Sequence, residues 1–303
     1  PDSPLPDALK AVMSDEEWKE SLQAQKDSMI EIGQKPTVEP TIADVQSVEV
    51  LKLFLAAGDD LRLAPSEVKR SYVGLENGGE FQCSAEDYRA YRLPRFGNAN
   101  PEPMDNPFWS DMVRLGGSAY SARDHFDDTE SLESAVWSYD RFGSSLTPLP
   151  DGRFVQTAGE HEDFYDPDFY IYNDVVIHDG QGGFKIVGYP QEVFPPTDSH
   201  TATLVDGSIY LIGCLGYADQ RKIGTTAVFR LAVDSWKIES VTTSGDIPSW
   251  LHEHRATYDV QRNAIRVEGG SILVDGGQAE PQITPNEDRH ELDLGTFTWR
   301  KLN

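Results

Sequence analysis

Hydrophobic and polar residues follow two different patterns along the chain, and the change divides it near residue 135. Before that point, apolar residues recur every three to four positions, which is typical of amphipathic helices. From Ala135 onward, short apolar runs alternate with polar residues and end at Gly, Asp or Asn, which favours β-strands and tight turns. We therefore expect a mostly α-helical region over residues 14–134 and a β region over residues 135–303.

Three segments carry the helical pattern most clearly. Residues 14–34 open on Ser14, a good helix cap, and keep apolar residues at helical spacing. Ser47–Ala57 places its apolar residues on one face and is followed by Gly58, a common helix stop. Trp109–Ala122 is predicted to form a further helix before an acidic linker.

The β region repeats one pattern three times, each copy having a Thr, a turn, an apolar strand and a Gly. The threonines are Thr147, Thr203 and Thr257, and the glycines are Gly159, Gly213 and Gly269. Successive threonines are 56 and 54 positions apart, and successive glycines are 54 and 56 apart. A period of this size in a strand-rich sequence predicts the blades of a β-propeller.

Each copy divides into four expected strands. The first copy gives Ser145–Leu149, Phe154–Ala158, Phe169–His178 and Phe184–Tyr189; the second gives His200–Val205, Ile209–Gly213, Thr226–Val233 and Trp236–Val241; the third gives His254–Val260, Ile265–Val267, His290–Leu294 and Thr298–Leu302.

The repeat resembles the kelch repeat of galactose-oxidase-like β-propellers over residues 136–303. The resemblance rests on the His-x-x-Thr motifs that begin at His200 and His254, on apolar strands that end in Gly, and on an aromatic residue near each fourth strand. Ser144 departs from it, because the family would place histidine there, and the family's glycine pair survives only as Gly269-Gly270. The resemblance implies a mainly β, kelch-like partial propeller of three four-stranded blades. The sequence does not match the copper ligands or the Cys–Tyr cross-link of galactose oxidase itself. In the helical region, residues 50–60 resemble the second helix of an ankyrin repeat.

Three blades leave an open edge, since propellers have four to eight. Three arrangements would cover this open edge. They are further degenerate blades upstream, a cap made by the helical region, and a homodimer that completes a propeller.

Charge narrows the classes of partner. The formal net charge is −25, from 51 acidic against 26 basic residues, which argues against binding a nucleic-acid backbone or an anionic membrane. It fits solubility through self-repulsion, a basic protein partner, or an inhibitor that mimics nucleic acid.

The chain has no stretch apolar enough to cross a membrane. Cys83 and Cys214 have no metal-binding spacing, so we expect a reducing cytoplasm. Residues 1–13 carry no secretory signal, and we expect a flexible tail or an expression remnant there.

Candidate chemistry lies in the long connections that join the second to the third strand of a copy, or one copy to the next. These are residues 159–168, 190–199, 214–225, 245–253 and 270–289, and they share one end of the sheets. The densest polar cluster contains Glu160, His161, Glu162, Asp163 and Asp166. Of these, His161, Glu160, Glu162 and Asp163 could act as acid and base, and His161, Glu160, Asp163 and Asp166 could hold a divalent metal. A solvated acidic loop would have the same composition.

Other polar residues are expected at the same end as ligand-binding candidates. They are Asp198, His200, His252, His254, Arg221 and Arg289. For each of His200 and His254 taken alone, the kelch pattern favours a buried structural hydrogen bond over ligand binding. For Arg221 and Arg289, the alternative role is the neutralisation of nearby acids.

Three functions follow from these residues. The main hypothesis is a cytoplasmic binding module that recognises a protein or peptide through its long loops. The alternatives are an isomerase, lyase or hydrolase of a small polar substrate, and an acidic inhibitor or immunity protein against a basic partner.

Overall fold

The computed structural model describes residues 41–76, 78–129, 134–161, 167–277 and 280–302. The helix predicted over residues 14–34 and the tail predicted over residues 1–13 lie outside these ranges. Within them, strand residues outnumber helical residues, and the strands do not close into a barrel or a propeller. No described helix has the length and apolar character needed to span a membrane. The chain forms two compact units, Pro1–Gly78 with Gly180–Gly182, and Gly79–Asp179 with Gly183–Asn303.

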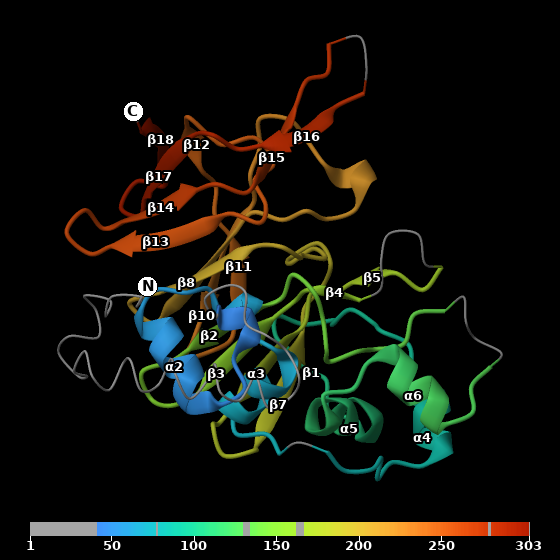
Figure 1. Cartoon of the computed structure of the whole chain (residues 1–303). Coiled ribbons are helices and arrows are strands. Elements are labelled where there is room, and N and C mark those ends of the chain that lie inside the picture. The colour runs from blue at the N-terminus through green and yellow to red at the C-terminus, as the bar shows by residue number, and fades with distance from the viewer. Residues whose placement is uncertain (1–40, 77, 130–133, 162–166, 278–279, 303) are drawn as a thin grey trace, which may run out of the picture. The chain divides into compact units, whose positions relative to one another are not determined.

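The described part of the smaller unit is helical. Its elements are η2 (Ile42–Asp44), α2 (Val48–Ala56), η3 (Leu61–Leu63) and α3 (Ser66–Tyr72) (Figure 1). The Ser47 hydroxyl accepts a hydrogen bond from the Val50 amide at 3.3 Å and starts α2, while Leu51 and Phe54 are buried. The amphipathic helix predicted at Ser47–Ala57 is therefore confirmed.

The larger unit begins with three short helices, α4 (Ala85–Tyr91), α5 (Pro107–Leu115) and α6 (Ala119–His125). The single helix predicted over Trp109–Ala122 is wrong, because Gly116 has φ 64° and ends α5. The Gly117 amide then bonds the Met112 carbonyl at 2.7 Å, and the Ser118 side chain caps α6.

Three sheets follow, and in each the four main strands pair antiparallel in sequence order. The first contains β2 (Ser145–Pro148), β3 (Phe154–Thr157), β6 (Val175–His178) and β7 (Phe184–Gly188); the second contains β8 (Thr201–Val205), β9 (Ser208–Ile212), β10 (Val228–Ala232) and β11 (Ile238–Ser240); the third contains β13 (Arg255–Asp259), β14 (Ala264–Glu268), β17 (Arg289–Asp293) and β18 (Thr298–Leu302) (Figure 1). Two short strands extend the outer edges, β1 (Glu102–Pro103) beside β7 and β12 (Ser244–Gly245) beside β18. The three predicted groups of four strands are thus present.

One predicted strand is interrupted. The segment Phe169–His178 divides into β5 (Tyr170–Ile171) and β6, and β5 pairs instead with β4 (Glu160–His161). The Asn173 side chain sits at the break and donates to the carbonyls of Tyr189 and Phe194 at 2.9 and 2.6 Å. The connection predicted over residues 270–289 also forms a hairpin, β15 (Ser271–Val274) with β16 (Gln282–Pro285).

Consecutive sheets share hydrophobic cores. The first strand of the second sheet, β8, contacts both β2 and β13, the first strands of its neighbours. Val155 of the first sheet packs in one cluster with Leu211 and Leu231 of the second. The opposite face of the second sheet contributes Tyr210 to another cluster with Leu292 of the third. Strand alternation therefore gives the middle sheet two buried faces.

The copies repeat backbone conformations as well as strands. Ser199 and Glu253, which precede equivalent strands, have φ of 54° and 55°. Trp236 and Phe297, in equivalent turns, have φ of 58° and 53°. Left-handed conformations are uncommon for such residues, so their recurrence marks a structural repeat rather than a coincidence of composition.

The two outermost faces of this array differ. On the first sheet, Val176 and Ile186 are 1% exposed, and Tyr139 contacts the same face: its hydroxyl lies 3.2 Å from Nε2 of His178, and its carbonyl accepts from the Gln156 side chain at 3.1 Å. Preceding residues of the same unit thus cover this face.

The outer face of the third sheet is charged instead. Glu291 has a fully buried side chain and forms ion pairs with Arg262, Arg266 and Arg300 at 2.9, 3.2 and 3.3 Å. These arginines are 46–56% exposed. The face that would receive a further apolar sheet therefore carries a network of ion pairs, a polar ending of the kind found in terminal repeats.

Candidate functional site

The connections at one end of the three sheets are joined by repeated backbone hydrogen bonds. The Ser199 amide donates to the Gly143 carbonyl, and the Glu253 amide donates to the Ser199 carbonyl, both at 2.8 Å. Because each acceptor belongs to the preceding copy, these bonds fix the starts of β2, β8 and β13 side by side. This end of the unit, which we call the loop end, holds most of the candidate residues.

His200 and His254 link neighbouring first strands. Nε2 of His200 lies 2.8 Å from the Ser145 hydroxyl, and Nε2 of His254 lies 2.9 Å from the Thr201 hydroxyl. Both histidines are fully buried. Each reaches back to the preceding sheet. Among the described residues no such sheet precedes the first copy, which gives a reason for Ser144 there. Their geometry is that of structural hydrogen bonds.

Asp198 and His252 occupy equivalent positions two residues before those histidines, and each is 2% exposed. Asp198 accepts hydrogen bonds from the Gly216 amide at 2.7 Å and the Ser199 hydroxyl at 3.1 Å. Burial raises the pKa of the Asp198 carboxyl, against the opposing effect of these bonds. Nδ1 of His252 lies 3.1 Å from the Trp250 carbonyl. Both side chains therefore point into packed protein.

The two candidate arginines lie in different settings. Arg221 donates to the carbonyls of Leu215 and Gly216 at 3.0 and 2.9 Å, so it closes its own loop, and burial lowers its pKa. Arg289 lies within β17, opposite Glu268 in the strand register, and is exposed. The structure thus places Arg289 on the outer face of the third sheet rather than in the connection predicted to contain it.

The His161 cluster is described only in part, because Glu162, Asp163 and Asp166 lie outside the described residues. Glu160 and His161 form β4, and His161 is 5% exposed. Burial lowers the pKa of His161 to about 4, so its imidazole is neutral near pH 7. Asp168, just beyond the undescribed segment, forms an ion pair with Arg123 in which both side chains are buried. Among the described residues, no three His, Cys, Asp or Glu side chains are grouped to hold a metal ion.

Exposed apolar side chains are the feature of the loop end that the sequence did not reveal. Phe142 is 71% exposed, Ile223 45% and Ile283 43%. They come from the connections at the first, second and third sheet respectively. Tyr120 of α6, 61% exposed, lies with its ring 6.0 Å from that of His161. No local pattern distinguishes these residues from buried ones, so only the tertiary structure identifies them.

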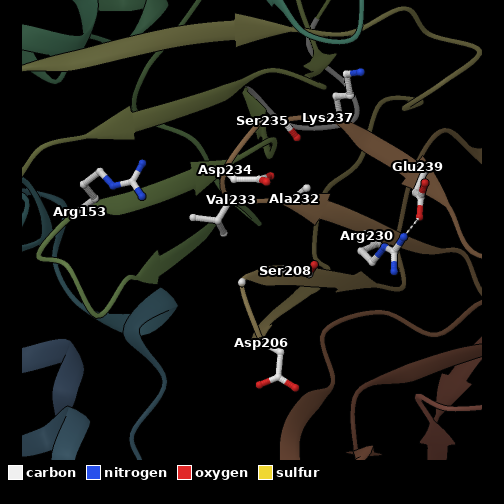
Figure 2. Close-up of a pocket in the computed structure, with 11 residues that line it drawn as sticks. Arg153, Asp206, Ser208, Arg230, Ala232, Val233, Asp234, Ser235, Lys237 and Glu239 are labelled. Carbon is white, nitrogen blue, oxygen red and sulfur yellow. Dashed lines mark ion pairs between the residues drawn. The ribbon is translucent and has the colours of Figure 1, made fainter.

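A hollow lies at the opposite end of the second sheet, around the short turns, and has a volume of about 640 Å³. Its charged lining residues are Arg153, Asp206, Arg230, Asp234, Lys237 and Glu239 (Figure 2). Arg230 pairs with Glu239 across the hollow's rim, as Figure 2 shows, and Arg153 pairs with Asp151 at 2.7 Å while its guanidinium lies over Trp236. With equal numbers of acids and bases, this lining selects neither anions nor cations.

Comparison with known proteins assigns no family: no family model matches the sequence, and no curated protein matches it.

Proposed function

We propose that this chain is a kelch-like binding module, built as a partial propeller of three blades, that recognises a basic protein or peptide through its loop end. The observation that carries the proposal is the exposure of Phe142, Ile223 and Ile283, one from the connections at each sheet. Exposed apolar side chains at one end of a protein, rimmed by polar residues, are a feature of many interaction surfaces.

The charge of the long connections at the loop end supports a basic partner. Residues 159–168, 190–199, 214–225, 245–253 and 270–289 contain fourteen Asp and Glu but only three Arg and Lys. An acidic rim around apolar side chains accelerates association with a cationic surface and disfavours anionic ones. Apolar anchors and charge thus favour the same class of ligand.

The geometry gives less support to an enzyme. His200 and His254 bond neighbouring strands, Arg221 bonds its own loop, and Asp198 accepts hydrogen bonds within the protein. Groups committed to such bonds are poorly placed to transfer protons to a substrate.

The proposal is tested by selecting binders from a library of random short peptides displayed on phage. We expect enrichment of peptides that combine Lys or Arg with apolar residues. Replacing Phe142, Ile223 and Ile283 together by Ser should remove that enrichment, because the anchors are lost while the acidic charge is kept. The salt dependence of binding by a selected peptide, measured by fluorescence anisotropy, reports the electrostatic contribution.

Val260→Ser provides the matched control. Val260 is 75% exposed but lies in the turn after β13, at the opposite end of the sheet. It should leave selection unchanged. Enrichment of acidic peptides, or equal losses in the control and the triple variant, would rule out recognition through the loop end.

A further inference from the structure

The outer face of the third sheet presents arginine side chains in rows across its strands. The register places Arg266 of β14 opposite Glu291 of β17, and Glu291 opposite Arg300 of β18. Residues that face one another across antiparallel strands have their side chains on the same side of the sheet. The other side is apolar and is buried in the core shared with the second sheet, where it contributes Ile265, Leu292 and Trp299. The row of Arg266, Glu291 and Arg300 therefore faces away from that core.

A second row lies two residues further along the strands. Arg255 of β13 is opposite Glu268, and Glu268 is opposite Arg289, and all three residues are exposed. Arg262, in the turn between β13 and β14, reaches the first row through its ion pair with Glu291. We call this surface the arginine face, and its arginines are Arg255, Arg262, Arg266, Arg289 and Arg300. Positive charge is thus concentrated on one face of a chain whose formal net charge is −25.

Three of these arginines converge on one buried carboxylate. The Nε atoms of Arg262 and Arg266 lie 2.9 and 3.2 Å from Oε2 of Glu291, and Nη2 of Arg300 lies 3.3 Å from Oε1. The Glu291 side chain is fully buried, whereas the three arginine side chains are about half exposed. The negative charge of this cluster therefore lies beneath the surface, and the positive charge reaches solvent.

The cluster has more hydrogen-bond donors than the chain's own acids can use. A guanidinium group carries several N–H donors in a planar fork, and three such groups share the two carboxylate oxygens of Glu291. Among the described residues, the one other acid that pairs with these arginines is Asp259, whose carboxylate lies 2.8 Å from Nη2 of Arg266. Three positive charges against two negative ones leave a positive surplus, so the exposed guanidinium groups can bind a further anionic group.

The arrangement also lowers two costs of binding an anion. The ion pairs with Glu291 hold the guanidinium groups in place before any ligand arrives, so less side-chain freedom is lost on binding. The net negative charge of the chain acts mostly from a distance, and at physiological ionic strength charges more than about 8 Å apart are largely screened. Binding at the arginine face therefore depends mainly on the charges of the face itself.

We infer that the arginine face is a docking surface for an acidic segment of another protein, whose Asp and Glu side chains bind the exposed guanidinium groups. Arginine clusters recognise acidic motifs in this way, since a guanidinium group forms paired hydrogen bonds with a carboxylate. This surface differs from the loop end and takes a partner of the opposite charge. The inference therefore does not rest on the proposed function.

The test uses the complete chain and two rhodamine-labelled peptides, one of alternating Glu and Gly and one with Gln in place of each Glu. Binding is measured by fluorescence anisotropy at physiological ionic strength. We expect Arg300→Gln and Arg255→Gln each to weaken binding of the Glu peptide about two- to fivefold, the effect of losing one exposed ion pair. Arg255 lies outside the Glu291 cluster, so its variant tests the face even if Arg300→Gln disturbs the third sheet. The Gln peptide should not bind measurably.

Arg230→Gln is the matched control, because it removes one positive charge from a strand of the second sheet, where Arg230 is 42% exposed and paired with Glu239. It should bind the Glu peptide as wild type does. Three results would each overturn the inference: no binding by wild type, equal binding by wild type and both face variants, or an equal loss in the control. Tighter binding of a single-stranded oligonucleotide than of the Glu peptide would also overturn it, because the preferred partner would then be a nucleic acid.

Discussion

The free energy of unfolding of this protein should decrease when the pH is lowered from neutral to mildly acidic, because of His178. This residue lies on β6, fully buried, with Nε2 3.2 Å from the Tyr139 hydroxyl. Burial lowers its pKa to about 4 from the ordinary value of 6.5. The folded protein therefore keeps His178 neutral in a pH range where the unfolded chain protonates it. The contribution of neutral His178 to the free energy of unfolding is complete above about pH 6.5 and is lost as the pH falls toward about 4.

The magnitude follows from the difference between the two pKa values. Each unit corresponds to about 1.4 kcal/mol, so the shift of His178 is worth about 3 kcal/mol over the full range, and about 2 kcal/mol between pH 7 and pH 5. His161, whose pKa burial also lowers to about 4, adds a separate loss of the same sign. Comparing variants at the two pH values isolates one histidine.

The measurement is urea denaturation at both pH values, followed by tryptophan fluorescence. Wild type should lose stability on acidification, and His178→Gln should lose about 2 kcal/mol less, whatever its own stability at pH 7. Val260→Ser changes an exposed side chain without removing a titratable group and should keep the wild-type loss. If the free energy of unfolding of His178→Gln decreases between pH 7 and pH 5 by as much as that of wild type, burial of His178 does not control its titration and the prediction is wrong.

Three further substitutions test the fold. Glu291→Gln should lower the free energy of unfolding by about 1–3 kcal/mol in chemical denaturation. The loss is smaller than that from breaking a fully buried ion pair, because the arginines around Glu291 are half exposed. An unchanged denaturation midpoint would mean that the network does not stabilise the third sheet. His254→Ala should cost about 2–3 kcal/mol, since it empties a buried site and leaves the Thr201 hydroxyl without its partner; wild-type stability would contradict the structural role. Gly213→Ala should shift the thermal midpoint downward, because Gly213 has φ 78° and an added methyl would collide with the Leu251 carbonyl; a tolerated alanine would show that this approach is looser than described.

Local signals were sufficient where one segment determines its own conformation. The helix α2 lies within the amphipathic segment predicted over Ser47–Ala57, and the strands of the second and third sheets lie within a few residues of their expected bounds. The alternation of buried and exposed positions is a property of the strand itself, so it can be read from the sequence. The break in the strand at Asn173 could not be predicted from the sequence, because the Asn173 side chain bonds to the carbonyls of Tyr189 and Phe194, which are distant in sequence.

The candidate site was predictable in location but not in its residues. Loop lengths indicated the correct end of the sheets for Asp198, His200 and His254, yet polarity alone could not separate a ligand-binding side chain from one that bonds a neighbouring strand. The exposure of Phe142 was equally hidden, since an aromatic residue in a connection is as compatible with a core as with a surface.

The sequence by itself determined the threefold repeat, the strands within each copy and the acidic charge of the long connections, because periodicity, turn residues and charge are carried by each segment locally. Only the tertiary structure decided which histidines join neighbouring sheets, that Glu291 and its arginines cover the last sheet, and which aromatic side chains reach solvent. These outcomes depend on contacts between residues far apart in the chain, and burial in a folded protein is set by those contacts rather than by residue type.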